Sequence, residues 1–145
     1  MKLCSKLLLG VVLLLAGCGY ADKLDPRLYT FANAKIAAES ARLHARDAGG
    51  TVTTITCCGS MKPLIQDGDV VVIVPTPYGD SLLGRVAVYT PKWSNGDRIA
   101  HRLVSGDAKA GFIASGDNNA TSEANERVRA DNYHGEIVAI YRTVP

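Results

Sequence analysis

The sequence has no run of basic residues. Its 16 lysines and arginines are spread along 145 residues and balanced by 14 acidic residues, which leaves a net charge of +2. Proteins that bind nucleic acid gather positive charge on one surface, so we expect no nucleic-acid partner. The sequence also has no cysteine–histidine spacing typical of a metal site and no glycine-rich phosphate loop. We therefore expect neither a metal nor a cofactor.

No apolar run is long enough to cross a bilayer, which takes about 20 apolar residues. Residues 7–16 form a shorter run that follows Lys2 and Lys6 and precedes small residues, as in an export signal. The run ends in Leu15-Ala16-Gly17-Cys18, which resembles the lipobox of bacterial lipoproteins. That resemblance implies cleavage before Cys18, membrane lipid on its sulfur, and a lipid-anchored location in the bacterial cell envelope. It leaves the choice between inner and outer membrane open.

The four cysteines divide accordingly. Cys4 leaves with the signal peptide, and Cys18 carries the lipid. Cys57 and Cys58 remain and are adjacent, so a disulfide between them would be strained. We favour two free, largely buried thiols over a vicinal disulfide.

By composition, we expect the chain to divide into three parts. Residues 1–17 are the signal peptide, residues 18–50 an anchor with a helix, and residues 51–145 a β domain. Asp25-Pro26 suits a helix start and Gly49-Gly50 a helix end, which predicts a helix over residues 27–48. Such a helix is either a stalk that lifts the domain off the membrane or packed on the domain, and the sequence does not separate these alternatives. We expect His44 to be solvated.

The sequence pattern of residues 51–145 is typical of a compact, mostly antiparallel β domain. β-Branched and alternating segments separated by turn residues predict six strands, at residues 51–56, 70–74, 85–90, 98–104, 110–115 and 136–142. The fold class is therefore mainly β, preceded by one N-terminal helix. Fourteen glycines and six prolines agree with a turn-rich chain.

Ser60 lies in a short turn segment, Cys58-Gly59-Ser60-Met61-Lys62-Pro63, just before the strand predicted at residues 70–74. A serine hydroxyl is a weak nucleophile near neutral pH. It needs a base beside it and hydrogen-bond donors for the oxyanion that forms. Taken alone, Ser60 is more simply read as a turn serine.

Four sequence blocks in this order resemble the signal peptidase I family of serine peptidases. They are Gly59-Ser60-Met61-Lys62-Pro63 with Gly68-Asp69, then residues 83–89, then residues 98–104 around His101-Arg102, then Gly116-Asp117-Asn118-Asn119. With a weaker match at residues 135–138, the resemblance extends from about Cys58 to Tyr141, which is nearly the whole predicted β domain. Where the bacterial branch of that family has lysine, this chain has His101, so it is similar to the Ser-His branch. That family also implies a signal-peptidase-like β fold.

The resemblance implies a role for each polar residue. Ser60 is the expected nucleophile and His101 its base, and a carboxylate orients the imidazole. Asp117 and Glu123 are both candidates for that carboxylate. We lean to Glu123, which replaces a shorter aspartate of the family, with Asp117 supporting the loop.

The same resemblance places two residues at the oxyanion and substrate site. The Ser60 backbone N–H and the Cys58 position supply the oxyanion hole, although a thiol is a weak donor. Met61 is expected to pack beneath the nucleophile.

The function expected from the resemblance is that of a membrane-anchored serine endopeptidase acting on polypeptides, with cleavage after small residues. The alternative is a non-catalytic lipoprotein that kept the fold and binds peptides or envelope partners. A processing peptidase for conjugation or pilus components is a variant of the first hypothesis. A self-cleaving repressor fits poorly, because such proteins pair serine with lysine and act in the cytoplasm.

Overall fold

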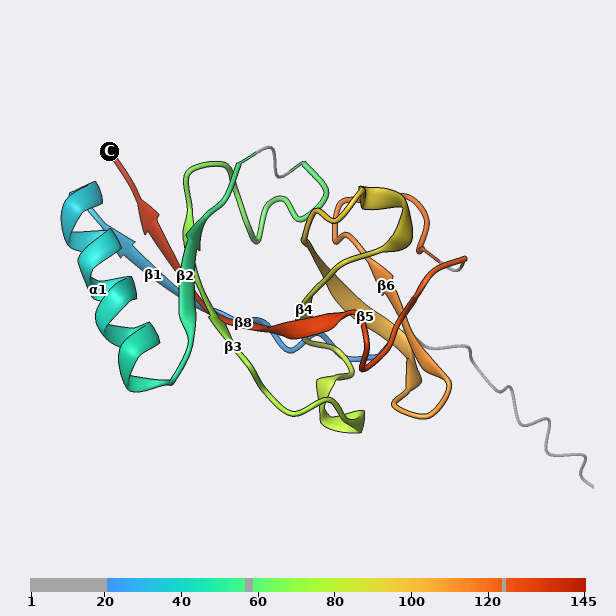
Figure 1. Cartoon of the computed structure of the whole chain (residues 1–145). Helices are drawn as coiled ribbons and strands as arrows, with labels where there is room; N and C mark the ends of the chain where they lie inside the picture. The colour runs from blue at the N-terminus through green and yellow to red at the C-terminus, as the bar shows by residue number, and fades with distance from the viewer. Residues whose placement is uncertain (1–20, 57–58, 124) are drawn as a thin grey trace, which may run out of the picture.

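The computed structural model describes residues 21–56, 59–123 and 125–145 (Figure 1). Predictions for the signal peptide, Cys18, Cys57 and Cys58 lie outside these residues. The regular elements are β1 Arg27–Phe31, α1 Ala34–Asp47, β2 Thr51–Thr54, β3 Val70–Val74, β4 Val86–Tyr89, β5 Ile99–Asp107, β6 Gly111–Ser115, β7 Arg127–Val128 and β8 Tyr133–Thr143, with short 3-10 turns η1 Asp80–Leu82 and η2 Lys92–Ser94.

The strands form one curled sheet in the order β2-β3-β8-β4-β5-β6-β7 (Figure 1). All neighbours in this order are antiparallel, and β1 adds to β8 as a parallel partner. The long strand β8 joins the two halves, because it pairs with β3 and β1 along its second part and with β4 near its start. The prediction of a mainly β, largely antiparallel fold is confirmed.

The predicted start of the helix is wrong. Residues Arg27–Phe31 form strand β1, and the helix begins only at Ala34. The Asn33 side-chain oxygen accepts hydrogen bonds from the backbone N–H groups of Lys35 and Ile36 and so caps the helix. Upstream, the rings of Tyr29 and Phe31 stack on Tyr141 of β8, which explains why this stretch is extended.

Helix α1 packs on the sheet and is not a free stalk. Ala37, Ala41 and Ala45 are buried on one face of the helix, against Val72, Ala139 and Tyr141. Small side chains at that spacing let a helix approach the sheet closely. No helix in the described part of the chain is long and apolar enough to cross a membrane.

The prediction that His44 is solvated is also wrong. His44 is half-buried, and its Nδ1 lies 2.8 Å from the Tyr141 hydroxyl. The ring is drawn onto the sheet because the neighbouring alanines bury this face of α1.

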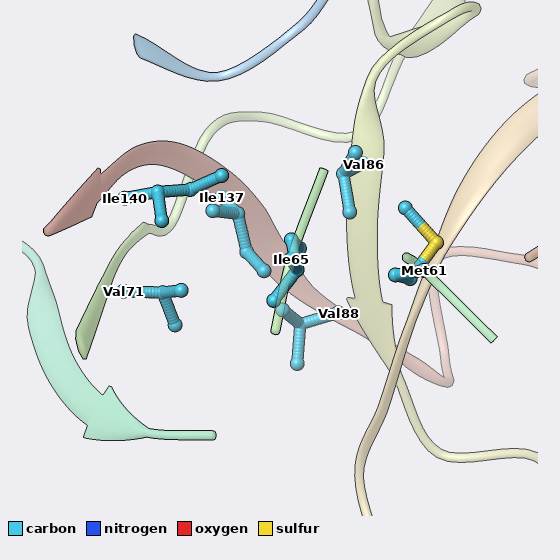
Figure 2. Packing of buried hydrophobic residues seen from close by; sticks show 7 residues of the cluster. All are labelled: Met61, Ile65, Val71, Val86, Val88, Ile137 and Ile140. Carbon is cyan, nitrogen blue, oxygen red and sulfur yellow. The ribbon is translucent and has the colours of Figure 1, made fainter. Parts of the chain in front are cut away.

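The strand core has two apolar clusters on either side of β4. One contains Met61, Ile65, Val71, Val86, Val88, Ile137 and Ile140 (Figure 2). The other contains Leu82, Ala87, Tyr89, Leu103, Phe112, Ala114 and Val128. Because β4 alternates between the two clusters, its neighbour β5 is held firmly, and β5 carries His101.

The short strand β7 was not predicted, and β5 and β8 run further than expected.

Candidate functional site

Ser60 and His101 meet although they are 41 residues apart in the chain. Ser60 lies in the turn after β2, and His101 lies on β5 opposite Ala87. The Ser60 Oγ is 2.9 Å from the His101 Nε2, and the histidine is only 4 % exposed. A hydroxyl and an imidazole at this separation are within reach for proton transfer.

Glu123 completes a chain of three polar groups. One of its carboxylate oxygens, Oε1, lies 2.6 Å from the His101 Nδ1. An ionised carboxylate only accepts hydrogen bonds, so Nδ1 carries the hydrogen. The Nε2 of a neutral imidazole is then free to accept a hydrogen bond from the Ser60 hydroxyl, as a general base requires.

The second oxygen of Glu123 is held by Tyr89. The Tyr89 hydroxyl donates to Glu123 Oε2 at 2.5 Å, and the same hydroxyl lies 3.4 Å from the His101 Nδ1. Burial and the Glu123 carboxylate raise the pKa of Tyr89, so it remains a donor. Burial tends to raise the pKa of Glu123, but the hydrogen bonds from His101 and Tyr89 outweigh it and lower that pKa. Glu123 is therefore ionised when it faces the imidazole.

Asp117 does not contact His101. It forms a paired hydrogen bond with Arg102, whose Nε and Nη2 donate to its two oxygens at 2.8 and 2.7 Å. Burial tends to raise the pKa of Asp117, but the bonds from Arg102 outweigh it and lower that pKa. Arg102 is only 1 % exposed, so the pair is a buried structural anchor beside the site.

Residues 21–25, which we call the N-terminal strap, lie against this anchor. The Asp25 Oδ1 accepts from Arg102 Nη2 at 2.7 Å, and the Lys23 Nζ lies 3.4 Å from Asp117. The backbone N–H of Ala21 donates to the Val104 carbonyl in β5, and that of Leu24 donates to the Gly84 carbonyl in the turn before β4. The segment that follows the predicted lipidation site is thus fastened to the loop beside Ser60.

The loop that contains Asp117 also supports Ser60. The backbone N–H of Asn118 donates to the Ser60 carbonyl at 2.7 Å, and its side-chain amide donates to the Gly59 carbonyl at 3.0 Å. Gly116 lies so close that an added Cβ would be 2.6 Å from the Ser60 carbonyl oxygen. Glycine is therefore required here by close approach of the two loops.

The oxyanion site is described only in part, because Cys58 lies outside the described residues. The Ser60 backbone N–H donates no hydrogen bond to another backbone group of the described residues. Met61 is 0 % exposed and packs on Val86 and Val88 of the core (Figure 2). It is not among the described residues that line the groove, and its expected role in substrate binding stays a prediction.

An open groove of about 890 Å³ leads up to Ser60 and His101. Its walls are residues 51–56 and 98–101, and apolar side chains form its floor. The floor residues are Val71, Ile73, Val88 and Ile137. The two walls run in the same direction, since four antiparallel steps separate β2 from β5.

Both walls present backbone edges to the groove. Strand β2 is the last in the sheet order, and β6 pairs with β5 only from Arg102 onward. The backbone groups of residues 99–101 that face away from β4 therefore have no strand partner in the described part of the sheet. Open edges of this kind can accept an extended peptide.

Sequence reasoning missed the contributions of Tyr89 and Arg102. The pairing of Ala87 with His101 and of Tyr89 with Ile99 places Tyr89 diagonally next to His101 on one face of the sheet. The alternation in residues 86–89 indicates the face of the strand on which Tyr89 lies. Only the register between the strands shows that Tyr89 is next to His101 on that face. The sequence places Arg102 beside His101 but does not indicate that Asp117 is its partner.

The described residues contain no group of three or more histidine, cysteine or acidic side chains that could hold a metal ion. Comparisons with family models, with curated proteins and with solved structures find no match to this chain.

Proposed function

We propose that this protein is a serine endopeptidase that uses Ser60 as nucleophile, His101 as base and Glu123 as the carboxylate that orients His101. The observation that carries the proposal is the continuous series of contacts from Ser60 Oγ through both ring nitrogens of His101 to Glu123, at 2.9 and 2.6 Å. Nucleophile, base and orienting group in this geometry are the parts that acyl transfer requires.

The chemistry follows from these positions. The Ser60 Oγ attacks a peptide carbonyl carbon while its proton passes to the His101 Nε2, and the backbone N–H of Ser60 faces the oxyanion. The imidazolium then protonates the leaving amine, and the acyl group stays on Ser60. Water, deprotonated by His101, hydrolyses the ester and restores the serine. Glu123 stabilises the imidazolium in both steps.

The groove supports a polypeptide substrate. A peptide strand between residues 51–56 and 99–101 would find open backbone edges on both sides. Val88 and Ile137 form part of an apolar floor in the groove that Ser60 and His101 line, and Ala100 is a small apolar residue in its wall. This floor favours small side chains at the cleavage position, in line with the resemblance to the signal peptidase I family.

The anchor would keep this site near a membrane. If Cys18 carries lipid, the five residues to Lys23 span at most about 18 Å, and Lys23 already contacts Asp117. The strap, and not a helical stalk, would then connect the lipid to the domain. Peptide segments close to the membrane surface are the substrates that such an attachment suits.

A non-catalytic peptide-binding lipoprotein is the second candidate, and the same open groove favours it. The test is cleavage of a peptide containing Ala-x-Ala by the chain without its signal peptide, followed by mass spectrometry. We expect cleavage after the second alanine, and its loss in Ser60→Ala and His101→Ala. Labelling of Ser60 by a fluorophosphonate separates the candidates: a folded protein that binds peptides but is neither labelled nor active is a binding module.

A further inference from the structure

We propose that the groove selects extended peptides that carry an acidic side chain four residues before the cleaved bond, where Arg98 and Trp93 receive it. The register of this preference rests on the proposed function, because Ser60 marks the cleaved bond. The charge preference itself rests on the groove and can be measured without cleavage.

Among the described residues, Arg98 at the rim of the groove has no acidic partner. It is exposed, it lines the groove, and it forms no ion pair or hydrogen bond with any described residue. Glu123 also lines the groove, but both of its oxygens are taken by His101 and Tyr89. Within the described lining, a bound peptide therefore meets uncompensated positive charge at Arg98. Charge complementarity of this kind selects an acidic group.

Trp93 provides an apolar surface at the same rim. It lies in η2, lines the groove, and is 58 % exposed, so a bound peptide can cover it. An aromatic ring that lines the same groove can contact the methylene groups of a glutamate whose carboxylate pairs with Arg98. It is also the only tryptophan in the sequence, so its fluorescence reports on this rim alone.

The spacing along β5 gives the position of the acidic residue. Arg98 comes three residues before His101, which is about 10 Å in an extended chain. In a peptide that runs parallel to β5, with the residue before the cleaved bond opposite His101, the fourth residue before the bond lies opposite Arg98. Side chains alternate in an extended peptide, so the fourth residue shares a face with the second, as Arg98 shares a face with Ala100 and not with His101.

The experiment uses three peptides with alanine at the first and third positions before the bond and Glu, Gln or Lys at the fourth. In wild type we expect kcat/KM to be about two- to fivefold higher for Glu than for Gln, and lower still for Lys, as for an exposed ion pair. Arg98→Glu should invert this order. Arg46→Glu, the same charge change on α1 away from the groove, should preserve it. Added salt should weaken the preference.

Binding is measured separately with Ser60→Ala protein by Trp93 fluorescence. Tighter binding of the Glu peptide, reversed by Arg98→Glu, supports the inference even if no peptide is cleaved, and then only the proposed activity fails. Cleavage of all three peptides at equal rates, or no inversion in Arg98→Glu, overturns the inference and leaves the activity standing. A lack of response to every peptide in both assays overturns it too. So does a Trp93 response to phosphatidylglycerol vesicles alone, which would mark the rim as a membrane contact.

Discussion

The Tyr89 hydroxyl donates a 2.5 Å hydrogen bond to the Glu123 oxygen that His101 does not use. Glutamate has one more rotatable bond than aspartate, so it loses more freedom when it is held in a single position. Contacts to both carboxylate oxygens restrict that freedom. Tyr89 is itself 0 % exposed and packed in the core, which makes it a rigid support for the orienting carboxylate.

Tyr89→Phe should therefore impair catalysis without unfolding the protein. It removes one hydrogen bond to a charged, partly buried group, an interaction worth about 1.5–3 kcal/mol. We expect kcat/KM for the Ala-x-Ala peptide to fall about tenfold and the urea midpoint to drop modestly. Steady-state kinetics and denaturation of the same sample measure both effects.

Tyr133→Phe is the matched control for that variant. The Tyr133 hydroxyl is buried and has no hydrogen-bond partner among the described residues. Its removal costs no hydrogen bond and relieves an unsatisfied polar group, so stability should stay level or rise, with activity unchanged. Equal losses in both tyrosine variants would contradict a specific role for Tyr89.

Gly116→Ala should displace the nucleophile. Its methyl group would meet the Ser60 carbonyl oxygen at 2.6 Å and the Ser60 Cβ at 2.8 Å, so the turn must shift. A shift of about 1 Å in a reacting group can lower the rate about a hundredfold. Gly79→Ala, where a Cβ meets nothing within 4 Å, should retain wild-type kinetics. Fluorophosphonate labelling rates of the two variants give the comparison, and equal rates would refute the close approach.

Substitution of Asp117 should mainly lower stability, whereas substitution of Glu123 should mainly lower activity. Asp117→Ala leaves Arg102 buried with less compensation, which should cost about 3 kcal/mol of stability. Glu123→Gln keeps the shape of the side chain but removes the charge facing His101. We expect it to lower kcat strongly with a smaller loss of stability. The idea fails if Glu123→Gln is fully active, or if Asp117→Ala is as stable as wild type.

Stability should fall in mild acid. The pKa values of Asp117 and Glu123 are both lowered in the folded protein, so below the ordinary carboxyl range the unfolded chain binds protons that the native state does not. Their contribution is complete above the carboxyl pKa range of the unfolded chain and is lost as the pH falls through the lowered pKa values of the folded protein. When urea midpoints are plotted against pH in this acid range, the slope should be shallower for the double variant with Asp117→Asn and Glu123→Gln than for wild type. Asp131→Asn, an exposed change, should keep the wild-type slope.

Much of the fold could be read from local patterns. Residues 70–74 are apolar and β-branched, and β3 has those same bounds. Residues 27–31 show the limit of local reading, because Asp25-Pro26 suggested a helix start where the chain forms β1. That stretch is a strand because Tyr29 and Phe31 stack on Tyr141 of β8, which lies more than 100 positions away in the sequence. Local propensity does not include such contacts.

By itself, the sequence determined the β character of the domain and drew attention to Ser60, His101, Asp117 and Glu123, because strand patterns and short motifs are local properties of a chain. Only the tertiary structure decided which carboxylate faces His101 and which is held by Arg102. It also decided that α1 lies on the sheet and that Tyr89 supports Glu123. These outcomes depend on strand register and on how loops from distant parts of the chain pack together. Register and packing are settled by the whole core at once.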